Sequence, residues 1–540
     1  MAQGLIWVRR VAIAAIALGL VLRFAHLDRK VYWHDEAYTS LRVAGYVGPA
    51  VEKAATDRPD LTAAELLRYQ QMPPEPSLAN SWIALANNPE HPPLYYLLAH
   101  GWGRLFGASV AGYRAIAAIF GAIAIAVMFW LGRLLFPASP AIAWVAVALL
   151  AVAPLQLIYS QEAREYTLWA VGLLLAHGSL IRAMERGTTS AWIAYGLALG
   201  LAWYGSLMTV LLGLSHGAYV VLSQVGSRAW LKPDQKWPAP KAWMGFMLAN
   251  GLGLGLFAPW LWVIVQQWGR LRAVTAWANE PRPLAYLAQF WGLHYSSMVV
   301  DFNAPLSHPF TLFGPALVLL VVGLGLRHIW HTQPRSLALF LSCGLLVPPL
   351  VLIGGDVVRG SQFSGTTRYF FPSLVLLPLA IAPLLVHWLT APQKSFKALG
   401  ATLLALLLTV GTASGVANNR ALTWWNKTVG YSNIHVANYL NQVPKPTVLL
   451  GASGIAMGEA LSLSHYLQPD TALWLLPQTT MPAPDSLQTV LEAQPQTTLF
   501  LLKPSPALLN TVPPGWQTAA IETGQFAPSD LVQLTPPPTS

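Results

Sequence analysis

Two adjacent carboxylates, Asp35 and Glu36, come directly after the first apolar segment, within residues 32–38, which read Tyr-Trp-His-Asp-Glu-Ala-Tyr. A carboxylate in this place can act as a general base, while its neighbour holds a divalent cation or orients an acceptor. The alternative is a belt of interfacial aromatic residues beside two solvated acids. An Asp-Glu pair alone does not decide between the two.

His91 opens residues 91–96, which read His-Pro-Pro-Leu-Tyr-Tyr. Two consecutive prolines exclude a regular helix at this point and so fix the direction of the His91 side chain. The imidazole can contact an anionic phosphate or a metal ion there. The alternative is a cap on a helix that starts beside the membrane.

A dense polar cluster occupies residues 159–166, Tyr-Ser-Gln-Glu-Ala-Arg-Glu-Tyr, between two apolar segments that need only a turn to connect them. Charges in such a turn are costly unless they form pairs or point into a wet cavity. Arg164 carries a planar fork that suits phosphate oxygens, and the neighbouring acids can orient it or bind a cation. The alternative is an internal ion pair that locks two spans together.

Arg368 lies at the head of another apolar segment, within residues 366–372, Thr-Thr-Arg-Tyr-Phe-Phe-Pro. Its guanidinium can serve as a second phosphate ligand. The alternative is an arginine whose aliphatic stem lies along apolar side chains while its charge reaches the interface.

The chain that must position these residues is too apolar for a water-soluble protein. Charged residues make up 10% and hydrophobic residues 54% of the sequence, whereas roughly 25% charge is typical of soluble domains. Its 540 residues leave room for about ten to twelve spans of about 20 residues each. The net charge of +10 comes from basic residues scattered between apolar segments, which indicates membrane topology rather than nucleic-acid binding. The single cysteine, Cys343, can form no intramolecular disulfide.

Eleven apolar segments are expected to cross the membrane. They lie at about 5–27, 111–135, 140–158, 166–183, 190–204, 206–223, 243–266, 311–327, 336–354, 370–389 and 398–415. Residues 92–107 are apolar but short, and we expect them to lie at the interface or to re-enter. The short basic loops then fall on the side of Arg9 and Arg10, as the positive-inside rule requires. The N-terminus is then cytoplasmic and, apart from a tight turn near Gly205, the outer segments are about 28–110, 159–165, 267–310, 355–369 and everything after about 416.

We predict a membrane domain over residues 1–417, with a first extracytoplasmic loop at about 28–110, and a separate domain over residues 418–540. The tail contains short β-like runs, Thr447 to Leu450 and Thr498 to Leu502. The predicted fold class is an α-helical polytopic membrane protein with about eleven transmembrane helices, followed by a small extracytoplasmic α/β domain.

Taken together and in this order, the four motifs resemble those of the bacterial members of glycosyltransferase family 39. These are C-type (GT-C) membrane glycosyltransferases, related to protein O-mannosyltransferases and to the aminoarabinose transferase of lipid A. The resemblance covers roughly residues 5–390. It implies the GT-C fold and the transfer of a sugar from a polyprenyl-phosphate carrier to an acceptor hydroxyl on the outer face, with inversion at the anomeric carbon.

The resemblance also implies roles for individual residues. By motif position, Asp35 corresponds to the catalytic acidic residue of the family's first loop, with Glu36 beside it. Arg164, Arg368 and His91 are expected to bind the donor phosphate, although the aminoarabinose transferase has lysine where this chain has His91. The residues expected to bind substrate are Tyr38, Tyr95, Tyr159, Gln161, Glu162, Glu165 and Tyr369. A divalent cation is left open as a cofactor, with Asp35, Glu36 and Glu162 as its ligands if it is present.

The expected partners are a polyprenyl-phosphate sugar, an acceptor lipid, glycan or protein, and the bacterial plasma (inner) membrane, which the chain crosses many times. The main alternative is a transporter or lipid flippase of the cell envelope, which would place ionisable residues near the bilayer midplane in broken helices. Few ionisable residues lie within the expected spans, and the charges gather in the outer loops, so an enzyme is favoured. A third reading is an inactive scaffold whose tail binds envelope partners.

Overall fold

The computed structural model describes residues 6–58, 61–229, 242–452, 454–476, 484–493, 498–521 and 530–537. The chain forms two compact units, each drawn from separate stretches of the sequence. The first unit comprises Met1–Leu27, Asn88–Tyr95 and Arg114–Arg420; the second comprises Asp28–Asn87, Tyr96–Tyr113 and Ala421–Ser540. The second unit therefore combines the C-terminal tail with much of the expected first loop, and the expected division into domains at 417/418 stays a prediction.

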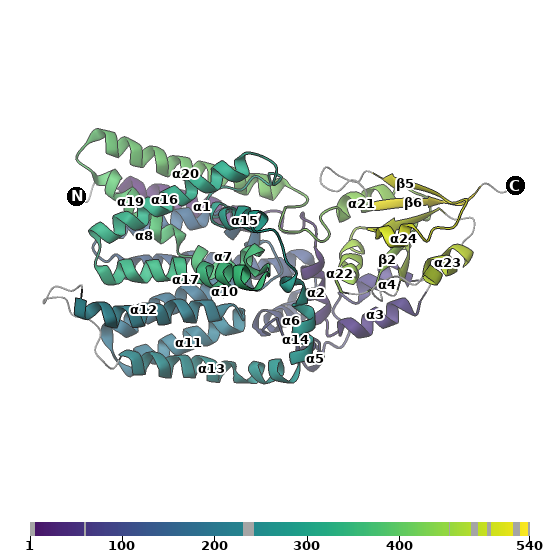
Figure 1. Ribbon diagram of the computed structural model, residues 1–540, viewed down its shortest axis with the longest axis horizontal. Coiled ribbons are helices and arrows are strands. Elements are labelled where there is room, and N and C mark those ends of the chain that lie inside the picture. The colour runs from purple at the N-terminus through teal and green to yellow at the C-terminus, as the bar shows by residue number, and fades with distance from the viewer. Residues whose placement is uncertain are drawn as a thin grey trace. The chain divides into compact units, whose positions relative to one another are not determined.

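The first unit is built from helices, many of them long and lying side by side (Figure 1). They are α1 (Ile6–Phe24), α8 (Pro140–Ala151), α9 (Pro154–Ser160), α10 (Tyr166–Arg186), α11 (Thr189–Gly205), α12 (Thr209–Ala229), α13 (Ala242–Gln266), α14 (Trp268–Val274), η2 (Ala276–Asn279), α15 (Leu284–Ser296), α16 (Phe310–Thr332), α17 (Arg335–Arg359), η3 (Phe363–Gly365), η4 (Thr367–Phe370), α18 (Phe371–Leu374), α19 (Leu377–Thr390) and α20 (Lys394–Arg420). Two further helices, α6 (Leu94–Phe106) and α7 (Val110–Leu135), have residues in both units. In α10, 83% of the most apolar stretch is buried inside the protein, so this helix lies within the bundle rather than at its edge.

Among the described residues, six helices are long and apolar enough to cross a membrane, or up to eight if each of two bent helix pairs counts as one span. The six are α7, α10, α13, α16, α17 and α20. Three segments expected to cross, 5–27, 190–204 and 206–223, form α1, α11 and α12, which fall outside this set. The α-helical polytopic fold class is confirmed, while the number of eleven spans and the placement of residues 92–107 stay predictions.

Both bent pairs break near a proline. Helices α8 and α9 meet at 58° directly before Pro154, and the segment Thr367–Leu374 meets α19 at 45°, with Pro378 in the first turn of α19. Proline has no backbone N–H and disfavours a helical conformation in the residue before it. At the first break, the N–H of Leu155 donates instead to the carbonyl of Ser297 at 2.9 Å. The interrupted backbone thus finds its partner within the protein, as a membrane interior requires.

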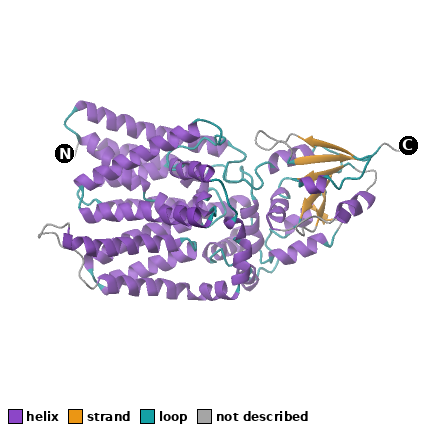
Figure 2. Cartoon of the chain, in the orientation of Figure 1, coloured by secondary structure: helices purple, strands orange, loops and turns teal. Residues whose placement is uncertain are grey.

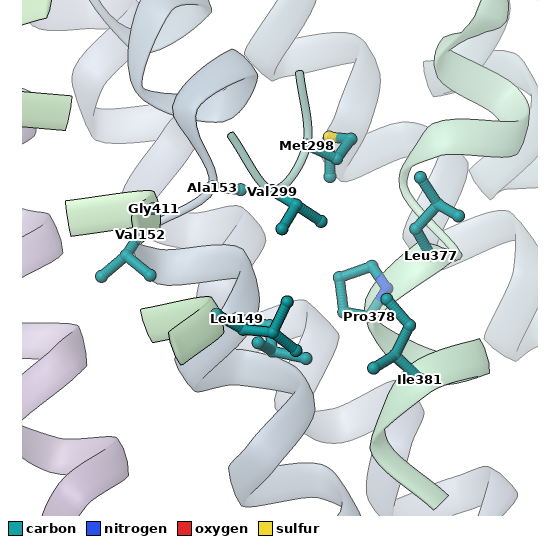
Figure 3. Close-up of a pocket in the computed structure, with 10 residues that line it drawn as sticks. Leu149, Val152, Ala153, Met298, Val299, Leu377, Pro378, Ile381 and Gly411 are labelled. Atoms are coloured by element: carbon teal, nitrogen blue, oxygen red, sulfur yellow. The ribbon is translucent and has the colours of Figure 1, made fainter. Parts of the chain in front are cut away.

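An apolar cleft lies between these two breaks (Figure 3). Its empty volume is about 320 Å³, and all ten residues that line it are apolar. Val152 comes from the first break, Leu377 and Pro378 from the second, and Met298 from the segment after α15. Gly411 of α20 belongs to the same wall, and a Cβ added to it would lie 2.9 Å from the Val152 carbonyl oxygen. A larger residue at this position would push α20 away from the break.

The second unit contains a sheet of six strands among its described residues, flanked by short helices (Figure 2). In the order β1-β3-β2-β4-β6-β5, the strands are β1 (Leu61–Thr62), β3 (Ala472–Leu476), β2 (Thr447–Gly451), β4 (Leu499–Leu502), β6 (Leu531–Thr535) and β5 (Gln517–Ile521). The helices are α2 (His34–Val43), α3 (Gly48–Thr56), α4 (Ala63–Arg68), α5 (Leu78–Ala86), α21 (Asn433–Leu440), α22 (Gly454–Leu463), α23 (Pro484–Ala493) and α24 (Pro506–Leu509).

Strands β2, β3 and β4 are parallel, with α22 and α23 as their connections, whereas β4, β6 and β5 are antiparallel. Strands β2 and β4 coincide with the two β-like runs predicted from the sequence. Leu449, Leu499 and Leu501 of these strands are buried against Leu487 of α23. The small α/β part of the predicted fold class is therefore confirmed.

Strand β1 joins residues of the expected first loop to the sheet of the tail. It pairs antiparallel with β3, with Leu61 opposite Leu473 and Thr62 opposite Ala472. Thr62 also caps α4, because its hydroxyl accepts the Glu65 N–H at 3.3 Å and the Glu65 carboxylate accepts the Thr62 N–H at 2.9 Å. This reciprocal cap satisfies two N–H groups that the first turn of a helix otherwise leaves without partners. It fixes the strand and the helix that follows it as one element.

Candidate active site

The predicted site residues fall into two groups, one in each compact unit. Asp35, Glu36 and Tyr38 belong to the second unit. The first unit holds all the others, namely His91, Tyr95, Tyr159, Gln161, Glu162, Arg164, Glu165, Arg368 and Tyr369. Three of the four motifs, apart from Tyr96, therefore belong to one compact body, and the first motif belongs to the other.

Arg164 lies in the short turn between α9 and α10, where its side chain is only 1% exposed. The backbone N–H of Arg164 donates to the Glu162 carbonyl at 2.7 Å, which closes the turn tightly. Its Nη2 atom lies 3.2 Å from Nδ1 of His91 and 3.3 Å from Oε1 of Glu165. The guanidinium also lies over the ring of Tyr166, 5.7 Å from the centroid. The turn thus holds a buried cation in a fixed orientation.

His91 links this turn to the preceding motif. A guanidinium can only donate hydrogen bonds, so Nδ1 of His91 accepts and Nε2 carries the proton. That Nε2 atom lies 3.5 Å from Oε1 of Glu90. The next carbonyl upstream, that of Pro89, accepts a hydrogen bond from Nε1 of Trp260 at 3.1 Å. Glu90, His91, Arg164 and Glu165 therefore form one continuous polar chain.

The electrostatics of this chain keep Glu165 ionised. Burial alone would raise the pKa of the Glu165 carboxyl, but the positive charge beside it, above all that of the Arg164 guanidinium, lowers it to about 2. Glu165 is therefore a carboxylate at neutral pH, and its negative charge offsets the positive charge of Arg164 and fixes its direction. Charge compensation of this kind is what allows an arginine to be buried at a helix end.

Aromatic packing brings the third and fourth motifs together. The ring of Tyr159, at the end of α9, lies 4.6 Å from the Tyr166 ring and 5.2 Å from the Phe371 ring, measured between centroids. Trp169 of α10 stacks on the same Phe371 at 6.0 Å. Tyr159 is 4% exposed. It therefore joins the Arg164 turn to the segment that carries Arg368, and packing accounts for its position without a substrate.

Arg368 is half-buried in η4, and its guanidinium lies over the ring of Tyr369, 5.5 Å from the centroid. Tyr369 is also half-buried. The preceding residue, Thr367, is held by a hydrogen bond between its hydroxyl and Nδ1 of His294 at 2.9 Å. Arg368 therefore combines partial access with an anchored backbone.

The remaining predicted residues of the first unit are buried. The Nε2 amide of Gln161 donates to the carbonyls of Leu22 and Ala25, at 2.8 and 2.9 Å, and so ties the end of α1 to the turn. Glu162 and Tyr95 are fully buried. The geometry of Gln161 fits a structural role better than the predicted contact with substrate.

In the second unit, Asp35 and Glu36 have opposite surroundings although they are adjacent. Asp35 lies in the first turn of α2, with its side chain 16% exposed and Oδ1 3.3 Å from Nε2 of His34. Glu36 is fully buried, and its Oε2 lies 3.1 Å from Nζ of Lys427, which is also fully buried. The Lys427 ammonium lies 5.4 Å from the centroid of the Trp33 ring. Asp35 is therefore the accessible carboxylate of the pair, and Glu36 forms a buried ion pair.

Tyr38 lies one turn further along α2. Its hydroxyl donates to the Gly454 carbonyl at 2.6 Å, and the Arg42 guanidinium lies over its ring at 5.2 Å from the centroid. Tyr38 thereby attaches α2 to the start of α22, so its hydroxyl has a partner within the unit. Among the residues that the structure describes, no group of three or more His, Cys, Asp or Glu side chains is placed to hold a metal ion.

Sequence reasoning missed the partners that orient these side chains. Lys427 pairs with Glu36 across 391 residues, and no local pattern marks such a pair. Asp356, near the end of α17, supports the Arg368 segment by accepting the Ser364 N–H. Glu90 was the easiest of them to find, because it directly precedes His91 in the sequence.

Comparison with known proteins gives this arrangement a class. Residues 90–262 match the family model described as dolichyl-phosphate-mannose-protein mannosyltransferase. Two crystal structures of ArnT from Cupriavidus metallidurans each match over 97% of both chains: the apo state with a TM-score of 0.54 and 13% identity, and the complex with undecaprenyl phosphate with a TM-score of 0.51 and 14% identity. At this identity the structural likeness concerns the fold. No curated protein matches the sequence.

The chain is therefore similar to membrane glycosyltransferases of the GT-C class, through a family match over about a third of its length and through the fold. The resemblance to bacterial members of glycosyltransferase family 39, stated above from the four motifs, is confirmed. The matched segment contains two of those motifs, with His91 and Arg164.

Proposed function

We propose that this chain is an inverting glycosyltransferase that moves a sugar from a polyprenyl-phosphate-linked donor to an acceptor hydroxyl at the outer face of the plasma membrane. The observation that carries the proposal is the chain of Glu90, His91, Arg164 and Glu165, which lies within the segment that matches the mannosyltransferase family. The match to an ArnT structure bound to undecaprenyl phosphate, over 97% of both chains, supports the choice of donor.

A lipid-linked donor enters from the bilayer, so its phosphate lies at the depth of the lipid headgroups. Groups that bind this phosphate should therefore stand at helix ends. Arg164 lies two residues before the start of α10, and Arg368 lies three residues before the start of α18. Both guanidiniums are packed over tyrosine rings, which limits their freedom without neutralising them. We assign them to the donor phosphate, with His91 orienting Arg164.

Asp35 is the proposed general base. Its carboxylate takes the proton of the acceptor hydroxyl while the acceptor oxygen forms a bond to the anomeric carbon of the sugar. The bond between the anomeric carbon and the phosphate oxygen breaks, and the polyprenyl phosphate leaves with the electron pair. Attack on the face opposite to the leaving group inverts the anomeric carbon. A positioned base of this kind contributes typically about 10²- to 10⁴-fold to a rate.

The leaving phosphate gains a second negative charge in this step. Fixed positive charges at the phosphate lower the energy of that transition state more than the energy of the bound donor. Arg164 and Arg368 are suited to this task because guanidiniums bind phosphate oxygens in a planar, bidentate fashion. Glu36 is assigned a supporting role, because its buried pair with Lys427 holds the first turn of α2 and with it Asp35.

The outer-face assignment rests on the distribution of charges along the sequence. Excluding residues 92–107 from the crossings puts most short basic loops on the side of Arg9 and Arg10, as the positive-inside rule requires. Reporter fusions after residues 109 and 165 test this assignment. Both reporters should be extracytoplasmic, and a cytoplasmic reporter at 165 would overturn it.

The enzymatic proposal is tested with the full-length protein in nanodiscs, supplied with undecaprenyl-phosphate sugars. We expect Asp35→Asn to lower transfer by at least about 100-fold, because the acceptor loses its base. Asp57→Asn is the matched control, since Asp57 is an exposed acid of the same unit. Wild-type transfer by Asp35→Asn would refute the role of Asp35.

A further inference from the structure

The loop before Arg368 is folded back onto the end of α17 by a single carboxylate. Asp356 lies in the last turn of α17 and is only 2% exposed. Its Oδ1 accepts hydrogen bonds from the Ser361 hydroxyl and, at 3.0 Å, from the Phe363 N–H. Its Oδ2 accepts the Ser364 N–H at 2.5 Å. One side chain therefore holds three of the four residues 361–364, which we call the Asp356 loop.

The turn begins where the helix ends. Gly360 caps α17 in the left-handed conformation, with φ of 69°, and its N–H donates to the Asp356 carbonyl at 2.8 Å. This conformation is unfavourable for residues with a Cβ atom. The reversal at Gly360 brings Ser361 back to the Asp356 carboxylate. Asp356 thus acts on the loop through both its backbone and its side chain.

A second residue that holds this segment, besides Asp356, is His294 of α15, which is distant in the sequence. His294 is fully buried, with Nε2 2.9 Å from the Ser364 carbonyl and Nδ1 2.9 Å from the Thr367 hydroxyl. A carbonyl can only accept, so Nε2 donates to it and Nδ1 accepts the hydroxyl proton. Both ring nitrogens are therefore used in a single neutral tautomer. The imidazole spans the chain from Ser364 to the residue directly before Arg368.

Ser364 forms hydrogen bonds with both Asp356 and His294. Its N–H donates to Asp356, its carbonyl accepts from His294, and its hydroxyl accepts from Nε1 of Trp291 at 2.8 Å. Trp291 and His294 are three residues apart on α15, so they share one face of that helix. The His294 ring also packs on Phe370, with 4.6 Å between centroids. Residues on both sides of Arg368 are therefore held by one histidine.

We propose that His294 and Asp356 are positioning residues for Arg368, which they act on through Ser364 and Thr367. Together they hold the backbone of η4 in one conformation. The Arg368 guanidinium is therefore already in place before the donor phosphate binds. Ordering a free arginine would cost rotamer and backbone freedom at each binding event. The inference rests on the proposed role of Arg368 as a ligand of the donor phosphate.

The test is a double-mutant cycle read by binding of undecaprenyl phosphate to the full-length protein in nanodiscs. Arg368→Ala should raise the Kd by about 10- to 100-fold, as expected for the loss of a charge-assisted hydrogen bond. Thr367→Val removes only the hydroxyl group that donates its proton to His294. It should raise the Kd by about 3- to 10-fold. His294→Phe removes both contacts and should raise the Kd further.

The decisive comparison is the same substitution in the Arg368→Ala background. If His294 and Thr367 act through Arg368, His294→Phe and Thr367→Val have no further effect on Kd there. Arg368→Lys provides a second background in which binding stays measurable. The control is His100→Phe, because His100 is also buried and bonded to a hydroxyl, that of Ser81 at 2.9 Å. We expect it to lower Tm without changing Kd in any background.

The outcomes separate the inference from the proposed function. If wild-type protein does not bind undecaprenyl phosphate, or if Arg368→Ala binds it as the wild type does, the proposed function of Arg368 fails. If Arg368→Ala weakens binding but Thr367→Val and His294→Phe do not, the positioning role is refuted. It is equally refuted if their effects are the same with and without Arg368.

Discussion

The buried pair between Glu36 and Lys427 allows a sharp test of how the second unit is stabilised. Both side chains are fully buried, with 3.1 Å between Nζ and Oε2. Removing one partner of such a pair leaves the other charge in the interior without compensation, which typically costs about 3–5 kcal/mol. We therefore expect Lys427→Met to lower the free energy of unfolding by this amount.

The expected shift in Tm follows from the size of the unit. For a body of roughly 200 residues, each kcal/mol lowers Tm by about 2–4 °C, so Lys427→Met should lower it by roughly 6–20 °C. Thermal unfolding of the full-length protein, followed by tryptophan fluorescence, measures this shift. The double variant Glu36→Leu with Lys427→Met should regain most of it, because replacing both charges by apolar side chains removes the unpaired charge.

The matched control is an exposed ion pair of the same unit. Arg58 and Glu65 lie 2.9 Å apart, with side chains 44% and 29% exposed. Such pairs contribute about 0–1 kcal/mol, so Arg58→Met should change Tm by only a few degrees. Equal shifts for Lys427→Met and Arg58→Met would refute the reasoning, since they would mean that water reaches Lys427.

Two further predictions concern stability in the first unit. Burial lowers the pKa of His294 to about 4 from its usual value of 6.5, so between these values the unfolded chain binds a proton that the folded chain does not. Stability should therefore rise with pH across that window, by up to about 3 kcal/mol, and His294→Gln should flatten the pH profile of Tm. A Cβ added at Gly19 of α1 would lie 2.3 Å from the Ala151 carbonyl oxygen, so Gly19→Ala should cost about 1–3 kcal/mol. Gly251→Ala, which meets no atom within 4 Å, should leave Tm nearly unchanged, and an equal loss in both variants would contradict this explanation.

Long apolar runs predicted much of the first unit well. The segment expected at 243–266 forms α13 at Ala242–Gln266, and the segment expected at 398–415 lies within α20 at Lys394–Arg420. These elements are set by local composition, because a helix satisfies its backbone hydrogen bonds within its own segment.

Contacts between distant residues could not be predicted in the same way. The segment expected at 140–158 is a bent pair of helices, and the Ser297 carbonyl that supports its break lies more than 130 residues away. Lys427 pairs with Glu36 from a distant part of the chain, so no spacing in the sequence marks it. Gln161 shows the reverse case, because a polar residue within a chemical motif donates hydrogen bonds to carbonyls at the end of α1. The type of a residue shows which interactions its side chain can make, while its neighbours in the folded chain decide which of them it makes.

The pairing of β1 with β3 has a consequence for the order of biosynthesis. Leu61 and Thr62 are made early, whereas Leu473 and Ala472, their partners in the sheet, are made some 400 residues later. At ribosomal speeds of about 5–20 residues per second, this interval is roughly 20–80 s. During that time Glu36 also lacks its ion-pair partner, because Lys427 has not yet been synthesised. The early part of the second unit must therefore stay soluble and unaggregated while most of the membrane helices are being inserted, and a nascent chain that stops before residue 421 would leave it permanently incomplete.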